Sequence, residues 1–594
     1  MKLLRLKITD PNGFRSLPRG FEHHFRTEWS LQNEMASEDD FAPFVCAGRN
    51  GSGKSNLLEV LAAIFFQLEI QRVRRNFLPE ALQDETLDSS PAAFELDYLI
   101  RVPAQYCHSG GPDWANVRVW KHPGESVRFQ WENQGDFDTD ANELFKGGHA
   151  DILLPQYVLG YSSGENEILS LPFFKTRFVQ LDEYWNSLRT LSQYPGRPDT
   201  RLAFLDNGFS QAMLICNLLF QDADAIALRA FREDVGIEAL KEFRIILRRS
   251  IPLTRQQAEV FTSGEYVLPT ETRDGRFADN EAIYLDPETG DYRLKVLRGL
   301  DGDERTSIIE KLKRCATLHF DDEASDTLIL DYWVNEATRR AFRDNFDDSA
   351  LALFQALQVL LTLNLYPVSE ALKTDLYTST SHYVSETVPT LASDQRIMRF
   401  KFVRFTKQGV PQPMMLKELS DGEHQLLHSL GLCLLFRGTN SLFLLDEPET
   451  HFNPDWRASF ISRLRECLGG PEGVSQEMLI TTHSPFLISD STPDKVLLFD
   501  RDPDNGKVQI THPDYNTLGA SINKITMSTF GKRETIGGRA QAVLEGFRTR
   551  LENGDVSDDL IDDIHRELGD SVEKILLVKA ILDERDQGGG EVQG

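Results

Sequence analysis

Five residues near the start of the chain have the types and the spacing that hold phosphate groups. The pattern G-x-x-x-x-G-K-[ST] is matched by Gly48, Gly53, Lys54 and Ser55, with an additional glycine at Gly51. Glycines let the backbone curl so that successive N–H groups point at phosphate oxygens, a lysine bridges the β- and γ-phosphates, and a serine ligates Mg²⁺. The apolar segment 41–47 before the loop and the helically spaced apolar segment 55–68 after it predict the strand and the helix that must position it.

These features predict that ATP binds at the loop with Mg²⁺ beside it. The residues expected to contact the nucleotide here are Asn50, Gly51, Ser52, Gly53, Lys54, Ser55 and Asn56. A glycine loop without a ligand is the alternative, so the prediction needs support from a second group of residues.

Two carboxylates end an apolar segment far downstream, 441–447. In a phosphate-transfer site the first acid holds Mg²⁺, and the second takes a proton from the attacking water. Another apolar segment, 477–482, ends at a histidine placed to contact a γ-phosphate or the hydrolytic water. Either feature alone also occurs for structural reasons, because acids often cap buried strands. The predicted metal ligands are Ser55 and Asp446, and the predicted catalytic residues are Glu447, His483 and Lys54.

A polar turn, 419–423, opens an apolar helix that extends to residue 436. Ser420 is a good N-cap residue, and Gly422 exposes its backbone N–H. The start of this helix can therefore receive an anion, so Ser420 and Gly422 are further candidates for nucleotide contacts.

Taken in chain order, these four pieces resemble the head of ABC-type ATPases, with its Walker A loop, LSGGQ-like signature, Walker B acids and His switch. The resemblance implies an α/β fold, an ABC-type P-loop ATPase head. We also expect a mainly helical inserted cap domain to split this head and a helical C-terminal tail to follow it. Asn453 stands where many relatives place the aspartate of the D-loop.

The opening residues indicate the branch of this group. The segment 1–17 begins with alternating apolar residues, which resemble the first strand of SMC/RecF/OLD ATPases. Phe14-Arg15-Ser16 then resembles the "NFRS"-type turn of that group. In that group the turn's arginine reaches the nucleotide, so the resemblance makes Arg15 a candidate; a surface salt bridge is its other interpretation. The opening is not a signal peptide, because charges interrupt it.

Charge and cysteine usage restrict the class of protein. Lys plus Arg number 64 and Asp plus Glu 92, a net charge of −28, which argues against nucleic acid coating the whole surface. Local basic patches remain possible at 71–77, 244–250 and 337–343, although each segment is equally a solvated helix face. Six scattered cysteines without a C-x-x-C pair favour a reducing, cytoplasmic location, and an apolar run long enough to span a membrane is missing.

The domain organisation follows from the spacing of these motifs. We expect a first head lobe at 1–175, an insert at 176–395, a second lobe at 396–530 and a helical C-terminal segment at 531–594 that ends in a flexible "GGGEVQG". The predicted elements are strands at 92–102 and 116–122, helices at 209–220, 237–250 and 349–366, and a hairpin at 281–297. The C-terminal segment suits docking onto a partner or a sister subunit.

Two loops raise separate questions. The loop from Ser162 to Glu167 sits where related heads carry the Q-loop, but it contains no glutamine. The acids Asp500, Asp502 and Asp504 invite comparison with the D-x-D of Toprim nucleases, whereas the residues "DPDNG" favour a hairpin turn.

Among known families the chain most resembles the PtuA-like ATPases of Septu and retron-associated antiphage systems. That resemblance implies an ATP-hydrolysing subunit that regulates a partner HNH nuclease and, in retron forms, works with a reverse transcriptase and its RNA/DNA. The resemblance to ABC-type heads, in which the signature helix meets the γ-phosphate held by a second copy, implies a head-to-head homodimer or a higher oligomer. One alternative is a RecF/SMC-like DNA-repair ATPase that binds DNA directly; another is a scaffold that binds ATP and barely hydrolyses it.

Overall fold

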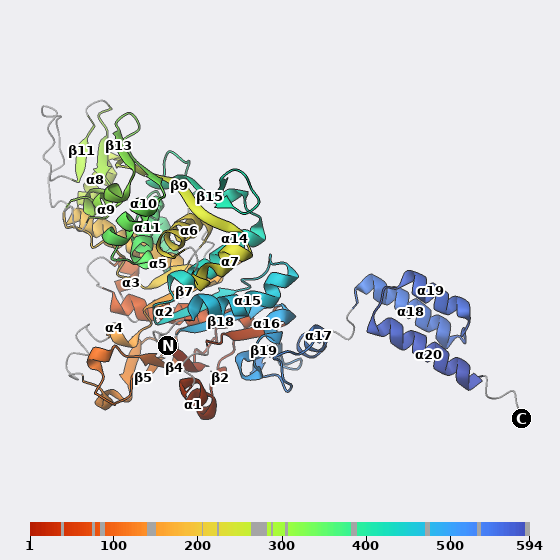
Figure 1. Ribbon diagram of the computed structural model, residues 1–594. Coiled ribbons are helices and arrows are strands. Elements are labelled where there is room, and N and C mark those ends of the chain that lie inside the picture. The colour runs from red at the N-terminus through yellow and green to blue at the C-terminus, as the bar shows by residue number, and fades with distance from the viewer. Residues whose placement is uncertain are drawn as a thin grey trace, which may run out of the picture.

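The computed structural model describes residues 1–588 except 37–40, 74–77, 84–88, 139–149, 165, 205, 223–224, 263–281, 287–288, 303–306, 382–388, 470–475 and 532–535. Residues 589–594, which hold most of the predicted flexible tail, therefore lie outside the described part. A large body with several sheets precedes three C-terminal helices (Figure 1).

A seven-stranded sheet forms the centre of the head, in the order β20-β19-β3-β18-β17-β7-β8. The strands are β3 (Phe44–Gly48), β7 (Tyr157–Ser162), β8 (Leu202–Phe204), β17 (Ser441–Asp446), β18 (Glu477–Thr482), β19 (Val496–Arg501) and β20 (Val508–Thr511). All neighbours are parallel except the β19–β20 hairpin. Every residue of β3, β17 and β18 is buried, as expected for a parallel sheet covered on both faces. The apolar segments that precede the three motifs thus become three adjacent strands.

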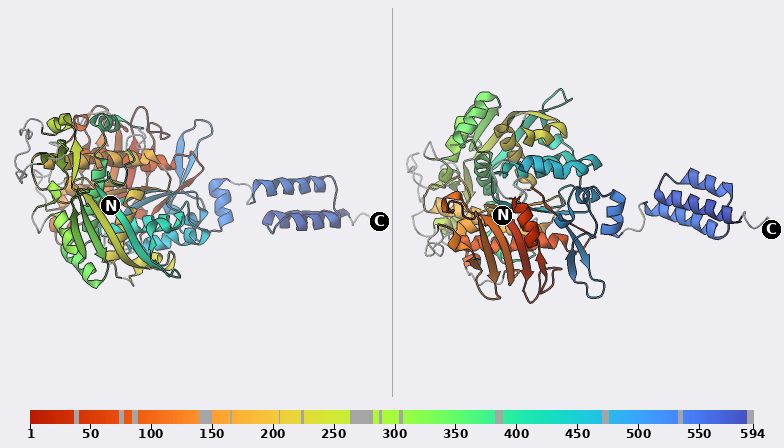
Figure 2. Two further views of the ribbon diagram at one scale, coloured as in Figure 1. Left: turned by 90° about the horizontal axis from the view of Figure 1, so that it is seen from above. Right: turned by 60° about the horizontal axis from the view of Figure 1, so that its bottom comes forward.

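A second, antiparallel sheet is built from the N-terminal lobe and stands at the front of Figure 2, right. Its strands, in order, are β2 (Glu22–His24), β1 (Lys2–Ile8), β4 (Phe94–Arg101), β5 (Trp114–Lys121) and β6 (Arg128–Trp131). The predicted strands at the chain start, 92–102 and 116–122 are confirmed. Helices α2 (Lys54–Arg72) and α5 (Glu167–Arg189) pack against each other beside the central sheet.

The insert contains more strand than the sequence predicts. The predicted helix at 237–250 is wrong, because β9 (Ile237–Arg248) is a strand between β14 (Thr327–Trp333) and β15 (Met398–Lys407). Its buried residues Phe243, Ile245 and Leu247 recur every second position, the period of a strand with one face on a core. Strands β9, β14 and β15 form a five-stranded sheet with β13 (Leu318–Asp322) and β16 (Met414–Met415). Because β15 and β16 follow residue 395, this sheet extends past the predicted end of the insert. Neighbouring strands therefore outweighed the helix formers Leu, Lys, Glu and Arg in this segment.

Helices cover one side of that sheet (Figure 1). The predicted helices at 209–220 and 349–366 are confirmed as α6 (Ser210–Phe220) and α11 (Ala350–Thr362), and they accompany α9 (Ile308–Cys315), α10 (Glu336–Asn345) and α12 (Glu370–Thr378). The predicted hairpin is β11 (Ile283–Leu285) and β12 (Tyr292–Lys295), which pair antiparallel. In the described part of the chain no single helix has the length and apolar character to cross a membrane, whereas α10 and α11, bent by 79°, pass such a test as a pair.

The C-terminal helices form a unit with its own core (Figure 2). They are α18 (Gly538–Glu552), α19 (Asp558–Glu567) and α20 (Val572–Gly588), and the buried side chains between them are Leu544, Phe547, Leu560, Ile564, Leu568, Leu577 and Ile581. The predicted helical character of this segment is confirmed.

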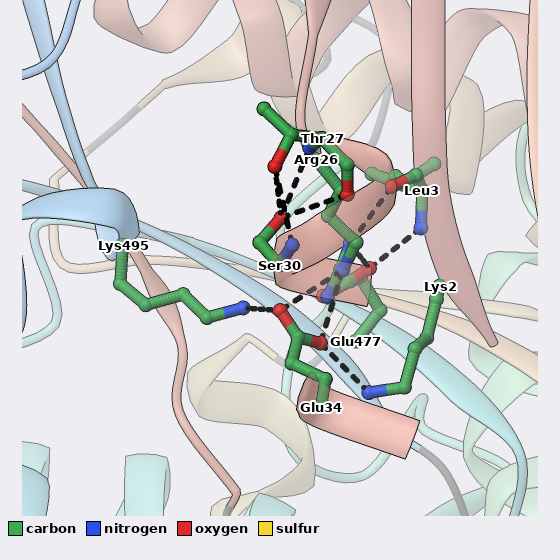
Figure 3. Close-up of polar contacts among 8 residues, drawn as sticks. All are labelled: Lys2, Leu3, Arg26, Thr27, Ser30, Glu34, Glu477 and Lys495. Atoms are coloured by element: carbon green, nitrogen blue, oxygen red, sulfur yellow. Dashed lines mark hydrogen bonds and ion pairs between the residues drawn. The ribbon is translucent and has the colours of Figure 1, made fainter. Parts of the chain in front are cut away.

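A buried ion network ties the two sheets of the head together (Figure 3). Arg26 donates to Glu477, the first residue of β18, at 2.7 and 3.1 Å and to Glu34 of α1 (Glu28–Ala36) at 3.0 Å. Glu34 also accepts from Lys2 of β1 at 3.0 Å and from Lys495. Burial raises the pKa of Glu34, but the three cations outweigh it and lower that pKa to about 2.

Glu34 should therefore make the stability of the head sensitive to acid. Because the folded pKa lies below the unfolded value, its stabilisation is complete above about pH 4.5 and is lost as the pH falls toward 2, an effect of about 3 kcal/mol. We expect the difference in thermal midpoint between the wild type and Glu34→Gln to be largest at pH 6 and to shrink below pH 4.5. A difference that stays constant from pH 6 to pH 3.5 would show that Glu34 contributes no charge-dependent stability.

Candidate functional site

The glycine loop between β3 and α2 has the backbone that phosphate binding requires. Gly48, Gly51 and Gly53 have φ values of 151°, 75° and 100°, which side chains other than glycine rarely adopt. A Cβ on Gly48 would lie 2.4 Å from the carbonyl oxygen of Phe499 on β19, so the sheet itself excludes a side chain there. Helix α2 begins at Lys54, and its N-terminus points its positive end into the loop.

Lys54 lies at the ends of the adjacent strands β3, β18 and β17, which precede the three motifs. Its Nζ is 3.2 Å from the carbonyl oxygens of Gly48 and Arg49 and 3.1 Å from Nε2 of His483, which follows β18. Burial lowers the pKa of Lys54, while the nearby carboxylates of Glu447 and Asp446 oppose this shift. The ammonium group is thus held at the mouth of the loop by carbonyl dipoles that phosphate oxygens can replace.

The carboxylate of Asp446, at the end of β17, connects the loop to two other elements. It accepts hydrogen bonds from the hydroxyl of Ser55 at 2.8 Å, from Thr481 of β18 at 2.7 Å and from the amide of Asn166 at 2.9 Å. A hydroxyl and a carboxylate in direct contact form a donor set of hard oxygens, which fits Mg²⁺. Ser55 and Asp446 are therefore the residues that would hold the metal, as the sequence predicts.

Glu447 follows Asp446 in a constrained backbone. Its φ is 49°, and its N–H donates to the carbonyl and the hydroxyl oxygens of Thr481 at 3.2 and 3.0 Å. One carboxylate oxygen lies 3.2 Å from Nε2 of His483. The hydrogen bond with His483 lowers the pKa of Glu447, although burial opposes it, so the carboxylate is ionised at neutral pH and able to accept a proton. The fold is that of an ABC-type P-loop ATPase head.

Asn166 and Thr481 belong to this site although the motifs do not single them out. Asn166 caps α5 by accepting from the N–H of Leu169 at 3.1 Å, and its amide donates to Asp446. It lies in the loop from Ser162 to Glu167, which position alone predicts to be the Q-loop. Asn166 carries the same amide group as glutamine on a shorter side chain, and its position at the start of a helix is the sequence signal that would identify it.

Arg15 contacts the insert. It has a φ of 53° and donates to the carbonyl oxygen of Thr380, just after α12, while its charge also acts on the carboxyl group of Glu59. The surface salt bridge therefore stays a prediction. The neighbouring residue Ser16 contacts the head instead, with its hydroxyl 2.5 Å from Oδ1 of Asn56 on α2. A role for Arg15 at the nucleotide stays a prediction, as does one for Asn56, whose side chain is held by Ser16 and Glu59.

The predicted signature turn begins α14 (Asp421–Leu435) as expected. Ser420 is exposed and caps the helix, accepting from the N–H of Glu423 at 3.4 Å while its own N–H donates to the Glu423 carboxylate at 2.8 Å. Gly422 packs closely, because a Cβ there would lie 2.7 Å from the carbonyl oxygen of His451. Asn453, at the predicted D-loop position, caps α15 (Pro454–Leu468) by accepting from the N–H of Trp456 at 2.8 Å.

The acids at 500–504 take part in a hairpin turn. Strands β19 and β20 pair antiparallel, and the carboxylate of Asp502 accepts from the N–H of Asp504 at 2.9 Å and from the amide of Asn505 at 2.7 Å. The predicted hairpin is confirmed. Within the described ranges no group of three or more His, Cys, Asp or Glu residues is arranged to hold a metal ion.

Comparison with known proteins agrees with this assignment in part of the chain. The model of the family described as "AAA domain, putative AbiEii toxin, Type IV TA system" matches residues 311–489, which include the predicted signature turn, Asp446, Glu447 and His483 but not the glycine loop. Protein ea59 of Escherichia phage lambda is 26% identical over 176 residues, 29% of this chain and 31% of that protein. The chain thus spans about a third of the length of this curated relative.

Solved structures of SMC heads are similar to the chain at low scores. The SMC head bound to the C-winged helix domain of ScpA gives a TM-score of 0.31 at 10% identity, covering 86% of this chain and 97% of that one. The SMC head domain from Thermotoga maritima gives 0.29 at 11% identity, covering 87% and 100%. Because these TM-scores are low, the fold is assigned from this chain's own strands and loops.

Proposed function

We propose that this chain is an ATP-binding and ATP-hydrolysing subunit of an antiphage defence complex that regulates a separate nuclease of the HNH type. The observation that carries the ATPase part is the 2.8 Å hydrogen bond between Ser55 and Asp446, with Glu447 and His483 beside Lys54. The defence part is supported by the resemblance to PtuA-like ATPases, which also adds a retron reverse transcriptase and its RNA/DNA as candidate partners.

Each residue has a role in the proposed hydrolysis. The N–H groups of the loop and Lys54 would bind and neutralise the phosphates, and Ser55 and Asp446 would hold Mg²⁺, which supplies electrostatic stabilisation when bound. Glu447 takes the proton from the attacking water, and His483 orients that water or the γ-phosphate. The 3.2 Å contact between Glu447 and His483 brings the proton acceptor and the orienting group to one point.

Isolation of the chain with its neighbours tests the defence part. A pull-down from the native operon should recover an HNH nuclease, and the purified chain alone should leave DNA and RNA uncut in the presence of Mg²⁺ and ATP. Cleavage by the isolated chain that is lost on Asp500→Ala and Asp502→Ala would instead place a nuclease centre at the β19–β20 hairpin.

We also propose that two copies associate head to head around ATP. The exposed start of α14 offers N–H groups to an anion, and in the proposed dimer it would meet the γ-phosphate held by a second copy, making an isologous contact. With Glu447→Gln slowing turnover, ATP should convert the protein to a dimer, and adding Ser420→Arg should keep it monomeric while each head still binds ATP. Light scattering with and without ATP measures both.

Ser557→Arg is the matched control for this substitution. Ser557 caps α19 in the C-terminal unit by accepting from the N–H of Leu560, so the change removes a helix cap of about 1 kcal/mol without touching α14. We expect Ser557→Arg to leave the ATP-dependent dimer intact. Dimers that form equally with Ser420→Arg would contradict the composite site.

The alternative function, direct binding of nucleic acid, is favoured by one surface of the insert. The face of the five-stranded sheet opposite its helices carries Trp333 and Phe320, which are 66% and 42% exposed in the described part of the chain. On the same face Arg244 and Arg404 lie 5.6 and 4.7 Å from the ring of Phe402. Aromatic rings beside arginines are typical of surfaces that stack the bases of single strands.

Arg244 and Arg404 also pair with Asp331 and Glu242, and the arginines of the other basic segments likewise make structural contacts. Arg339 and Arg343, in the segment 337–343, donate to the carbonyl oxygens of Leu218 and Phe220 at the end of α6. In the segment 71–77, Arg72 binds the carboxylates of Glu69, Asp151 and Asp199, and residues 74–77 lie outside the described part.

Under this alternative, Trp333→Ala should weaken binding of a 20-nucleotide single strand about 5- to 150-fold, because stacking on one aromatic side chain contributes about 1–3 kcal/mol. Trp29→Ala is the control, since Trp29 is 74% exposed on α1. Fluorescence anisotropy compares the two variants. Equal affinities would remove the sheet face as a nucleic-acid site.

A further inference from the structure

Glu449 is a buried acid beside the catalytic residues that the proposed mechanism does not use. It follows Glu447 by two residues, is 4% exposed, and sits in the segment between β17 and α15. Burying a carboxyl group has a cost unless its oxygens are bonded, so a contact of this residue must compensate.

That contact is with the turn that carries His483. One oxygen of Glu449 accepts a hydrogen bond from the hydroxyl of Thr482, and the same hydroxyl accepts from the N–H of Ser484 at 2.8 Å. Thr482 and Ser484 flank His483 on both sides. The turn is thereby closed by a hydroxyl whose own orientation is fixed by Glu449.

Thr481, the residue before Thr482, also makes hydrogen bonds at the end of β18. Thr481 donates to Asp446 and accepts from the N–H of Glu447. The pair Thr481 and Thr482 therefore fastens the end of β18 to the segment after β17 from two directions. His483, the next residue, projects from this doubly held end toward Lys54 at 3.1 Å and Glu447 at 3.2 Å.

The surroundings of Glu449 favour its neutral form. Its second oxygen is buried without a hydrogen-bond partner in the described part of the chain. Arg457 donates to the backbone oxygen of Glu449 at 3.4 Å and not to its carboxyl group, while Glu447 adds a like charge nearby. Burial raises the pKa of Glu449 to about 7. The side chain of Glu449 accepts a hydrogen bond from Thr482, and a neutral carboxyl group can accept that bond as well as a carboxylate can.

We infer that Glu449 is a positioning residue that acts through Thr482 to hold the imidazole of His483 between Lys54 and Glu447. This inference rests on the proposed ATPase function and names a new residue for it. Because the role needs only an oxygen acceptor, an amide of the same shape can perform it. The requirement at Glu449 is thus the reverse of that at Glu447, where the negative charge accepts the proton.

Turnover and nucleotide affinity of matched variants test this inference. Glu449→Gln should keep kcat, whereas Glu449→Ala and Thr482→Val should lower kcat about 10- to 100-fold, since a displacement of about 1 Å costs up to 10²-fold, and leave KM unchanged. Thr482→Val should have no further effect in a His483→Ala background, because residues acting through one group are not additive. Equal losses in Glu449→Gln and Glu449→Ala, or an additive effect of Thr482→Val on His483→Ala, would overturn the inference.

A second measurement does not depend on turnover. The ¹⁵N resonances of labelled His483, assigned by their loss in His483→Ala, should shift in Glu449→Ala and Thr482→Val but not in Glu449→Gln. Absence of hydrolysis by the wild type would refute the proposed function while this signal still decides the positioning role. If the His483 resonances keep the same chemical shifts in Glu449→Ala, Thr482→Val and Glu449→Gln, the positioning role is refuted.

Discussion

Replacing Glu447 with glutamine should leave ATP binding intact and slow hydrolysis about 10²- to 10⁴-fold, the range for loss of a general base. The amide keeps the shape of the side chain and its contact with His483, so only the proton acceptor is removed. The strained backbone at this residue, with a φ of 49°, is unaffected by the change. Phosphate release under single-turnover conditions measures the chemical step.

Glu449→Gln is the matched control for this experiment. It makes the same chemical change two residues away, where the structure requires no charge, and should hydrolyse ATP at close to the parental rate. Glu447→Gln protein that hydrolyses at the parental rate would remove Glu447 from the mechanism.

Lys54→Ala should abolish ATP binding at concentrations that saturate the wild type. Hydrogen bonds to charged groups contribute about 1.5–3 kcal/mol each, so losing two of them weakens binding about 10²- to 10⁴-fold. Fluorescence of a labelled ATP analogue measures the affinity without Mg²⁺ and with it.

The stability of the fold provides the control for Lys54→Ala. Lys54 is a buried cation whose free-state partners are carbonyl oxygens and His483, so its removal should not lower the thermal midpoint of the nucleotide-free protein. ATP should raise the midpoint of the wild type and not that of the variant. A variant that is stabilised equally by ATP would show that the loop binds phosphate without its lysine.

The sequence predicts the site best at positions where the structure accepts a single residue type. Gly48 and Gly53 are required by backbone angles, and Asp446 by its contact with Ser55, so the loop and the acids could be located before the structure. The strand β9 could not, because its helix-forming residues become a strand only through pairing with β14 and β15. Pairing partners 79 or more residues away leave no local pattern.

Other contacts of the site depend on how distant segments meet. Glu449 and Thr482 carry no motif, and their hydrogen bond exists because β17 and β18 are neighbours. Asn166 reaches Asp446 for a similar reason, since β7 lies next to β17. Sequence spacing places such residues on loops but does not indicate which loops share an edge of the sheet.

The close approach of Gly422 to His451 has a mechanical consequence for a pair of heads. A Cβ at Gly422 would lie 2.7 Å from the carbonyl oxygen of His451, so the start of α14 packs directly against the segment after Glu447. In the proposed dimer, a pull on α14 by ATP in the other copy would displace the hydrolytic acids of its own copy. ATP binding at the two sites would then be positively cooperative. Turnover would rise with ATP concentration more steeply than for independent sites, with a Hill coefficient above unity.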